Sequence, residues 1–183
     1  MTTFNEATHA HQTALDPARI TIIAPAASHG AGMWRVAGAA GELDLNSSYM
    51  YLVFARDFAD TCRVALEGDD VVAFVLGYRR PEHPDRLFVW QVAVDAQHRG
   101  AGLAGRLLDD LIDTAGTGDV PLRCVETTIT DDNTASQRLF AGFAARRGAA
   151  LETTALFDAQ DFPDQHDAER LHRIGPFPPS QRD

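Results

Sequence analysis

A glycine-containing turn between two apolar segments is the part of the sequence with the clearest chemical meaning. The string VDAQHRGAGLA (94–104) lies between an apolar run and an expected amphipathic helix. Backbone N–H groups at the start of a helix are unpaired and carry partial positive charge, so they suit a phosphate group. Gly100 and Gly102 let the backbone approach that group, and Arg99 can add a charge-assisted contact. The turn therefore predicts a pyrophosphate-binding loop.

The spacing within this loop separates it from other phosphate-binding motifs. A pair of glycines alone is also compatible with a plain strand-to-helix connection that binds nothing. Here the pattern Q-x-x-G-x-G follows a strand, which differs from the GxGxxG dinucleotide fingerprint and from the P-loop. It resembles motif A of the GNAT superfamily of N-acetyltransferases, in which this loop holds the pyrophosphate of coenzyme A. The run NTASQRLF (133–140) is similar to that superfamily's next motif, which implies that Asn133 lies beside the pantetheine.

The resemblance implies the GNAT acyltransferase fold, of class α/β. Its central sheet is mixed and twisted, antiparallel in the N-terminal part, with helices on both faces. The strands at 87–94 and 124–130 form a parallel pair that splays apart, so the pantetheine of acetyl-CoA pairs with the free edge of the first. A backbone N–H near Val92 would then bind the oxyanion. The cofactor-binding residues expected on this basis are Val92, Ala93, Val94, Arg99, Gly100, Ala101, Gly102, Leu103, Ala104 and Asn133.

Three further features fall outside the cofactor motifs. Asp44, Asn46 and Tyr49 flank an expected helix start, where a cap explains the neighbouring serines only. Trp90 lies within an apolar strand, where a core role is the ordinary explanation. Glu126 lies in an interior strand, and burying a carboxylate is costly without a partner. Since burial raises the pKa of a carboxyl group, we expect Glu126 to act as general base toward an amine.

Longer strings narrow the resemblance within the superfamily. They are LDLNSSYMYLVFARDFADTC, FVLGYRRPEHPDRLFVWQVAVD and VETTITDDNTAS, and the match extends over about residues 20–174. They closely resemble a family that acetylates the N4 amine of L-2,4-diaminobutyrate, a step of ectoine biosynthesis. The resemblance implies a homodimeric enzyme whose acceptor pocket includes Asp44, Tyr49, Trp90 and Glu126, and we expect Asn46 to contribute. His166, in a matching C-terminal string, either closes over the substrate or is a surface histidine.

The sequence leaves several roles open. Many superfamily members carry a tyrosine as general acid where Phe140 stands, and Phe140 has no proton to give. The thiolate then leaves unprotonated or is protonated through water, with Tyr49 as a candidate donor. Arg79 and Arg80 are candidates to bind an acceptor carboxylate. Rival interpretations are an acetyltransferase of another small amine, such as a polyamine or aminoglycoside, and an acetyl-CoA sensor without turnover. A sensor needs no general base, so Glu126 argues against the second.

The elements that position these residues follow from periodicity and turn signals. Gly68 and the two aspartates after it mark a hairpin, and the two prolines in RPEHPD (80–85) mark a loop. Strands are expected at 20–24, 61–67, 71–79, 87–94 and 124–130, with 151–157 as the last. Helices are expected at 28–40, 47–60, 102–114 and 135–143.

Composition limits the class of protein. The chain has 183 residues, 45% of them hydrophobic and 23% charged, which is typical of one globular domain. We expect that domain at 19–174, between flexible tails at 1–18 and 175–183. The net charge of −10 disfavours nucleic acid and anionic membranes as partners. No secretory signal and no apolar run of membrane-spanning length is visible, so we expect a cytoplasmic protein.

Cysteine and histidine usage predicts no metal site. Cys62 and Cys124 lie in apolar, strand-like runs, outside any CxxC pair, so buried reduced thiols are expected. His9 and His11 have no further ligand at useful spacing, and we interpret them as part of the tail.

Overall fold

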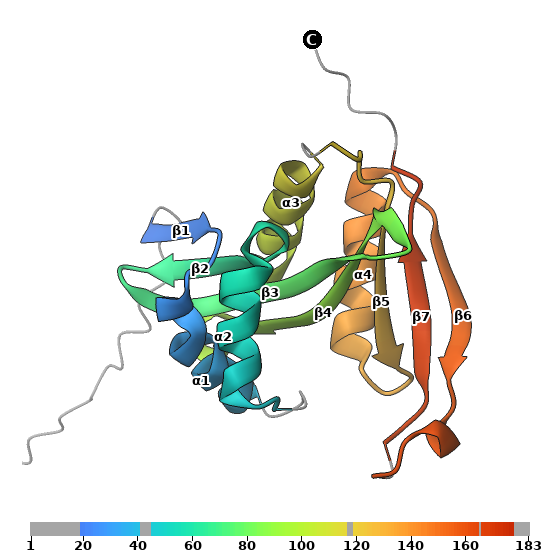
Figure 1. Cartoon of the computed structure of the whole chain (residues 1–183), viewed down its shortest axis with the longest axis horizontal. Coiled ribbons are helices and arrows are strands. Elements are labelled where there is room, and N and C mark those ends of the chain that lie inside the picture. The colour runs from blue at the N-terminus through green and yellow to red at the C-terminus, as the bar shows by residue number, and fades with distance from the viewer. Residues whose placement is uncertain (1–18, 41–44, 117–118, 165, 178–183) are drawn as a thin grey trace, which may run out of the picture.

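The protein folds into one seven-stranded sheet with helices on both faces (Figure 1). The computed structural model describes residues 19–40, 45–116, 119–164 and 166–177. The strands are β1 (Ile20–Ile23), β2 (Arg63–Glu67), β3 (Asp70–Arg80), β4 (His83–Val94), β5 (Cys124–Thr130), β6 (Leu151–Phe157) and β7 (Glu169–Ile174). The longer helices are α1 (Gly30–Ala40), α2 (Ser48–Asp57), α3 (Leu103–Ala115) and α4 (Thr134–Arg147).

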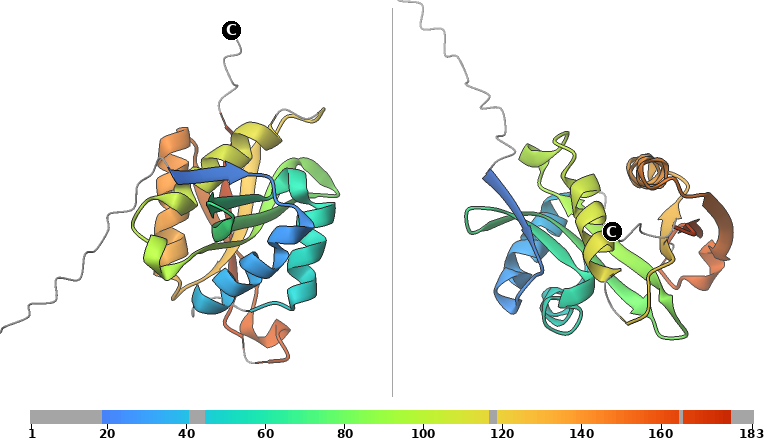
Figure 2. Two further views of the ribbon diagram at one scale, coloured as in Figure 1. Left: turned by 90° about the vertical axis from the view of Figure 1, so that its left-hand side faces the viewer. Right: turned by 90° about the horizontal axis from the view of Figure 1, so that it is seen from above.

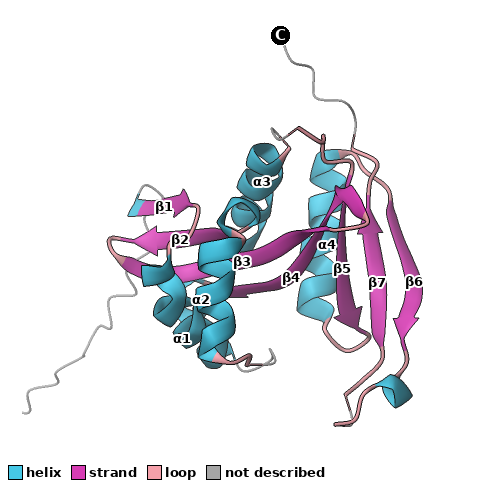
Figure 3. Ribbon diagram, in the orientation of Figure 1, coloured by secondary structure: helices cyan, strands magenta, loops and turns pink. Residues whose placement is uncertain are grey.

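The sheet is antiparallel except at one joint in its middle. Its order is β1-β2-β3-β4-β5-β7-β6, and among the described strands only β4 and β5 run parallel. Their pairing extends from Arg86 with Cys124 to Phe88 with Glu126, and beyond these residues the strands diverge (Figure 3). The sheet therefore has two parts, β1–β4 and β5–β7–β6, which separate toward the C-terminal ends of β4 and β5. This confirms the mixed sheet and the splayed pair that the sequence predicted.

Two hydrophobic cores hold the helices to the sheet. On one face, Met33 of α1 and Tyr51 of α2 pack with Phe74 of β3. On the other face, Leu107 of α3 and Phe143 of α4 belong to a larger core with residues of β3, β4 and β5. In the view from above in Figure 2, the blue and cyan helices α1 and α2 lie on the side opposite to α3 and α4. The predicted arrangement of helices on both faces is confirmed.

The C-terminal segment differs from the prediction. The strand at 151–157 is not the last, because β7 follows it and inserts between β5 and β6, antiparallel to both. The ordered chain also extends past residue 174. The ring of Phe177 lies 6.1 Å from that of Phe143 in an edge-to-face contact, and its N–H donates to the carbonyl of Arg123. The partly buried ring of Phe177 therefore anchors the chain within the segment that the sequence assigned to a flexible tail.

Other boundaries move by a few residues. The expected loop at 80–85 is a tight turn, because β4 already begins at His83 and pairs there with Arg80. The expected tail at 1–18, the residues from 178 on, His9 and His11 lie outside the described part of the chain. Within that part, no helix is both long and apolar enough to cross a bilayer, and no three acidic, histidine or cysteine side chains are grouped to hold a metal ion.

Both cysteines are buried reduced thiols. Cys62 is fully buried, and desolvation raises the pKa of its thiol to about 12; burial likewise raises the pKa of Cys124. Because the thiolate is the reactive form, we expect neither cysteine to react with Ellman's reagent in the folded protein within minutes. Both should react on unfolding in urea. Fast release of chromophore from the native protein would contradict this assignment.

Candidate active site

The divergence of β4 and β5 opens two adjoining cavities. The smaller one, of about 480 Å³, lies beside the glycine loop. The larger one, of about 1040 Å³, is lined by β4, β5 and the segment leading into β7. Val92, Asn133 and Ser136 line both cavities. The two are therefore neighbouring parts of one site, and they meet where the strands have parted.

The glycine loop presents unpaired backbone donors to the smaller cavity. Asp95 accepts a hydrogen bond from the N–H of Gln97 at 3.0 Å and closes a turn directly after β4. Gly100 and Gly102 follow with φ of 81° and 71°, a left-handed conformation that side chains disfavour. Gly102 precedes α3, and no side chain caps the N-terminus of that helix. The first amides of α3 are thus available to an anion.

Most of the expected cofactor-binding residues line this smaller cavity. They are Val92, Ala93, Val94, Arg99, Gly100, Gly102, Leu103, Ala104 and Asn133; Ala101 is not among them. Arg99 donates to the carbonyl of Ala40 at 3.1 Å, so it also holds the loop against the end of α1. Asn133 caps α4 by accepting from the N–H of Ser136 at 3.0 Å. The glycine loop and the cap of α4 therefore both border the smaller cavity.

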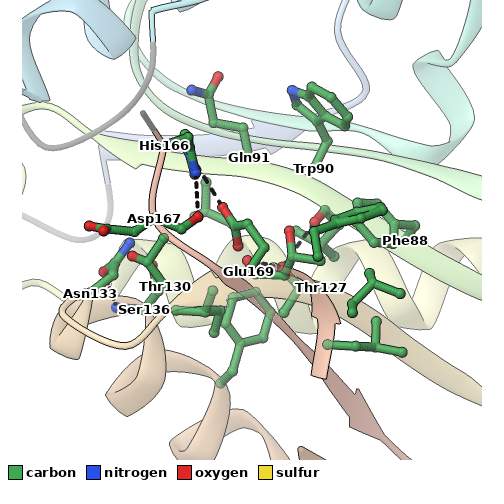
Figure 4. A pocket seen from close by; sticks show the side chains of 18 of the residues that line it. Phe88, Trp90, Gln91, Thr127, Thr130, Asn133, Ser136, His166, Asp167 and Glu169 are labelled. Carbon is green, nitrogen blue, oxygen red and sulfur yellow. Dashed lines mark hydrogen bonds and ion pairs between the residues drawn. The ribbon is translucent and has the colours of Figure 1, made fainter. Parts of the chain in front are cut away.

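A β-bulge in β4 lies beside the point where the cavities meet. Val89 and Gln91 pair with consecutive residues of β3, which leaves Trp90 as the extra residue. The bulge reverses the alternation of side chains. Val89 faces the core beneath α3 and α4, whereas Gln91 accepts a hydrogen bond from Tyr51 of α2 at 3.0 Å. Thr127 of β5 donates to the carbonyl of Val89, replacing a ladder bond where the strands separate, and half-exposed Trp90 lines the larger cavity (Figure 4).

One end of the larger cavity is acidic. Its charged lining there consists of Asp132, Asp164, Asp167 and Glu169, with His166 among them. Nδ1–H of His166 donates to the carbonyl of Asp167 at 2.7 Å, and its Nε2 lies 3.8 Å from Oε1 of Glu169 (Figure 4). The ring of His166 stacks on Phe162 with 4.5 Å between centroids. The histidine is thus fixed at the wall of the cavity.

Glu126 is not among the residues that line the larger cavity: it lies behind Arg80, which lines the opposite end, and is surrounded by arginines. Its carboxylate is fully buried and accepts from Arg80 at 2.8 Å, Arg86 at 3.0 Å and Arg173 at 2.8 Å. Burial alone would raise the pKa of Glu126, but the hydrogen bonds and charges of Arg80 and Arg173 outweigh it and lower the pKa. The expectation of a raised pKa is therefore wrong. An ionised carboxylate engaged by three guanidinium groups is a weak proton acceptor.

The remaining acceptor residues separate into three groups. Asn46 and Trp90 line the larger cavity, while Asp44 lies outside the described residues. The structure does not bring Tyr49 into the lining: its side chain is 70% exposed, because Tyr51 takes the inward-facing side of α2. Phe140 is buried and lines the cavity with a ring that has no proton to donate.

Sequence reasoning missed several polar residues of the site. Tyr51, Gln91 and Thr127 lie in apolar or β-branched runs whose hydrogen bonds depend on the bulge and on the strand divergence. Arg86 and Arg173 reach Glu126 from β4 and β7. The isolated carboxylate in a strand was the available signal, because a buried charge requires partners.

A splayed strand pair, an uncapped helix behind a glycine turn and two adjoining cavities are the arrangement expected of an acyl-coenzyme A-dependent transferase. The profile of the Acetyltransferase (GNAT) family matches residues 33–143, and the chain belongs to that family. Solved structures that share only the fold include Ard1 from Thermoplasma volcanium, with 18% identity over 86% of this chain and 98% of that chain and a TM-score of 0.69.

More similar proteins share one name. The L-2,4-diaminobutyric acid acetyltransferase of Streptomyces coelicolor is 52% identical over 87% of this chain and 95% of its own. The enzyme of the same name from Chromohalobacter salexigens is 44% identical over 86% of this chain and 81% of its own. The structure of diaminobutyrate acetyltransferase EctA from Paenibacillus lautus, in complex with L-2,4-diaminobutyric acid and coenzyme A, has a TM-score of 0.81 at 39% identity and covers 86% of this chain and 95% of that one. Within the GNAT family, this identity and coverage place the chain among the diaminobutyric acid acetyltransferases.

Proposed function

We propose that the protein transfers the acetyl group of acetyl-CoA to the N4 amine of L-2,4-diaminobutyrate. The products are N4-acetyl-L-2,4-diaminobutyrate and CoA, and the reaction is a step in the synthesis of ectoine, a compatible solute used in osmoprotection. The observation that carries the proposal is the meeting of an anion-binding cavity with a charged acceptor cavity at Val92, in a chain about 50% identical to diaminobutyric acid acetyltransferases.

The cofactor site follows from the two strands and the loop. The pyrophosphate of acetyl-CoA would accept hydrogen bonds from the amides that start α3. The pantetheine would lie along β4 beyond Phe88, where the pairing with β5 has ended, and beside Asn133. This places the thioester near Val92, between the two cavities. The backbone N–H near Val92 would then hold the oxyanion.

The chemistry is direct transfer within a ternary complex. The N4 amine attacks the thioester carbonyl, the new C–N bond forms, and the C–S bond breaks to release the thiolate of CoA. The attacking nitrogen loses a proton as the amide forms, and this proton passes through water to the thiolate, because Phe140 has no proton to donate. Asp44, Asn46 and Trp90 are proposed to bind the acceptor.

A proton acceptor must first convert the ammonium group to an amine. We assign this step to His166, whose Nδ1–H is committed to Asp167 and whose Nε2 is therefore the basic nitrogen. Glu169, 3.8 Å from Nε2, would stabilise the imidazolium that forms. Glu126 is too strongly engaged by arginines to serve.

A homodimer in the cytoplasm is the proposed state of the enzyme. In support of a dimer, every residue of β6 is exposed, including the large apolar side chains of Leu151, Leu156 and Phe157. An exposed apolar edge strand of this kind is suited to form an interface with another chain. Sedimentation at micromolar concentration tests this directly, and a monomer at all concentrations would contradict it.

A panel of acceptors tests the function. With saturating acetyl-CoA, the release of CoA thiol should be fastest for L-2,4-diaminobutyrate, slower by about tenfold or more for ornithine, and slower still for spermidine. One methylene is typically worth a factor of about 10–200 in such discrimination. Preference for spermidine or an aminoglycoside would make the protein an acetyltransferase of another amine. Binding of acetyl-CoA without turnover of any acceptor would make it a sensor.

A further inference from the structure

The larger cavity contains an arginine whose guanidinium group is only partly used. Arg80, the last residue of β3, lines this cavity and donates through Nη1 to Oε2 of Glu126 at 2.8 Å. Its side chain is 36% exposed. Within the described part of the chain, its Nε and Nη2 have no hydrogen-bond partner. Glu126 thus holds the guanidinium in place while further N–H donors remain for a ligand.

The arginines around Glu126 carry more positive charge than its single carboxylate can neutralise. Three guanidinium groups, those of Arg80, Arg86 and Arg173, share one carboxylate, which leaves an excess of two positive charges. Glu152 of β6 is paired in register with Arg173 and offsets charge on that side. Arg80 has no second ion pair among the described residues. The end of the cavity at Arg80 therefore attracts an anion.

The larger cavity is acidic at the end away from Arg80, so its two ends differ in charge and can orient a bound amino acid. Glu169, at the acidic end, is paired with Thr130, which lies four residues beyond Glu126 on β5, or roughly 13 Å at about 3.3 Å per residue. β4 runs parallel to β5, so the acidic end is also the end nearer Val92 and the cofactor cavity. An amino acid with its carboxylate at Arg80 would extend its side-chain amine toward the thioester. The reverse orientation would bring its carboxylate against the acidic residues.

We propose that Arg80 binds the α-carboxylate of the acceptor and that Glu126 positions Arg80 for this contact. The inference rests on the proposed function and adds a determinant of specificity to it. Arg80 selects α-amino acids over diamines. The fixed separation between Arg80 and Val92 sets the distance between the carboxylate and the amine that reacts.

The experiment compares two acceptors that differ in the carboxylate alone. L-2,4-Diaminobutyrate and 1,3-diaminopropane are titrated by calorimetry into the CoA-saturated protein, and their kcat and KM are measured with acetyl-CoA. Arg80→Gln is expected to weaken diaminobutyrate binding about 10- to 100-fold, the range for a charge-assisted contact, mainly through KM. Binding and turnover of 1,3-diaminopropane should stay within about twofold of the parent. Arg80→Lys should recover part of the loss, because it keeps the charge but not the planar fork.

Arg86→Gln is the matched control. Arg86 donates to the same carboxylate but does not line the cavity, so this variant should keep the preference for diaminobutyrate. The role of Arg80 is overturned if Arg80→Gln keeps the parental preference, if it weakens both acceptors equally, or if Arg86→Gln loses the preference to the same extent. Unchanged CoA affinity in each variant verifies that the cofactor site is intact. A parent protein that does not acetylate diaminobutyrate overturns the proposed function itself.

Discussion

Replacing Gly102 by valine should raise the KM for acetyl-CoA by about 10- to 100-fold while the protein remains folded. A Cβ at this position meets no atom within 4 Å, so the new side chain enters open space at the start of α3, where the pyrophosphate is expected. Each charge-assisted hydrogen bond from a backbone amide is worth about 1.5–3 kcal/mol. Loss of one such hydrogen bond to the pyrophosphate accounts for the predicted increase in the KM for acetyl-CoA. Steady-state kinetics and calorimetric titration of CoA measure it.

Gly68→Val is the matched control for backbone strain. Gly68, in the β2–β3 hairpin, also has a left-handed φ, 61°, and open space around its missing Cβ, but it lies outside both cavities. Strain of this kind costs about 1–3 kcal/mol at either position. Gly68→Val should therefore lower the melting temperature and leave the KM for acetyl-CoA unchanged. Equal cofactor affinity in Gly102→Val and in the parent would show that the loop does not bind the pyrophosphate.

Glu126→Gln should destabilise the protein and impair use of the acceptor together. The amide cannot balance Arg80, Arg86 and Arg173, so three guanidinium groups lose their shared anion. Removing one partner of a buried pair costs about 3–5 kcal/mol, and the partial exposure of the arginines reduces this to about 2 kcal/mol. The melting temperature should fall by about 4–8 °C for a chain of this size. Displacement of Arg80 should lower kcat/KM for diaminobutyrate at least about tenfold.

The pH dependence of this variant separates positioning from proton transfer. Because the folded state lowers the pKa of Glu126 below its ordinary value of 4.5, the carboxylate stabilises the protein above that pH. The contribution is lost as pH falls through the lower folded pKa, so parent and variant should converge in stability in acid. The activity of Glu126→Gln should not return as pH rises, whereas that of His166→Gln should return in part as free amine forms. Recovery of Glu126→Gln at high pH would restore Glu126 as the general base.

Local sequence signals predicted the backbone elements that surround the smaller cavity. The glycine turn before α3 and the hairpin at Gly68 are set by neighbouring residues, so a single sequence is enough to predict them. The same holds for the apolar runs of β4 and β5 and for the parallel pairing between them. The divergence of these strands was predicted from the resemblance to the GNAT superfamily. Short-range patterns thus suffice wherever the backbone itself forms the site.

The acceptor side depends on contacts between distant segments, and there the sequence misled. β7 contains only two aliphatic residues, and its two arginines bind Asp131 and Glu126, so it lacks a typical apolar strand pattern. An apolar run of residues does not predict the bulge at Trp90, although this bulge determines on which face of the sheet the side chain of Gln91 lies. The direction of the pKa shift of Glu126 was predicted from burial alone, because Arg80 and Arg173, which reverse that direction, are 46 and 47 residues away in the chain.

The identity of the acetylated nitrogen tests the central claim most directly. The purified protein is incubated with acetyl-CoA carrying a ¹³C-labelled acetyl group and with L-2,4-diaminobutyrate, and the product is examined by two-dimensional NMR. We expect one product, in which the labelled carbonyl couples to the N4 amide and the α-amine remains free. A product acetylated on the α-amine, or no labelled amide while CoA is bound normally, would contradict the function proposed for this site.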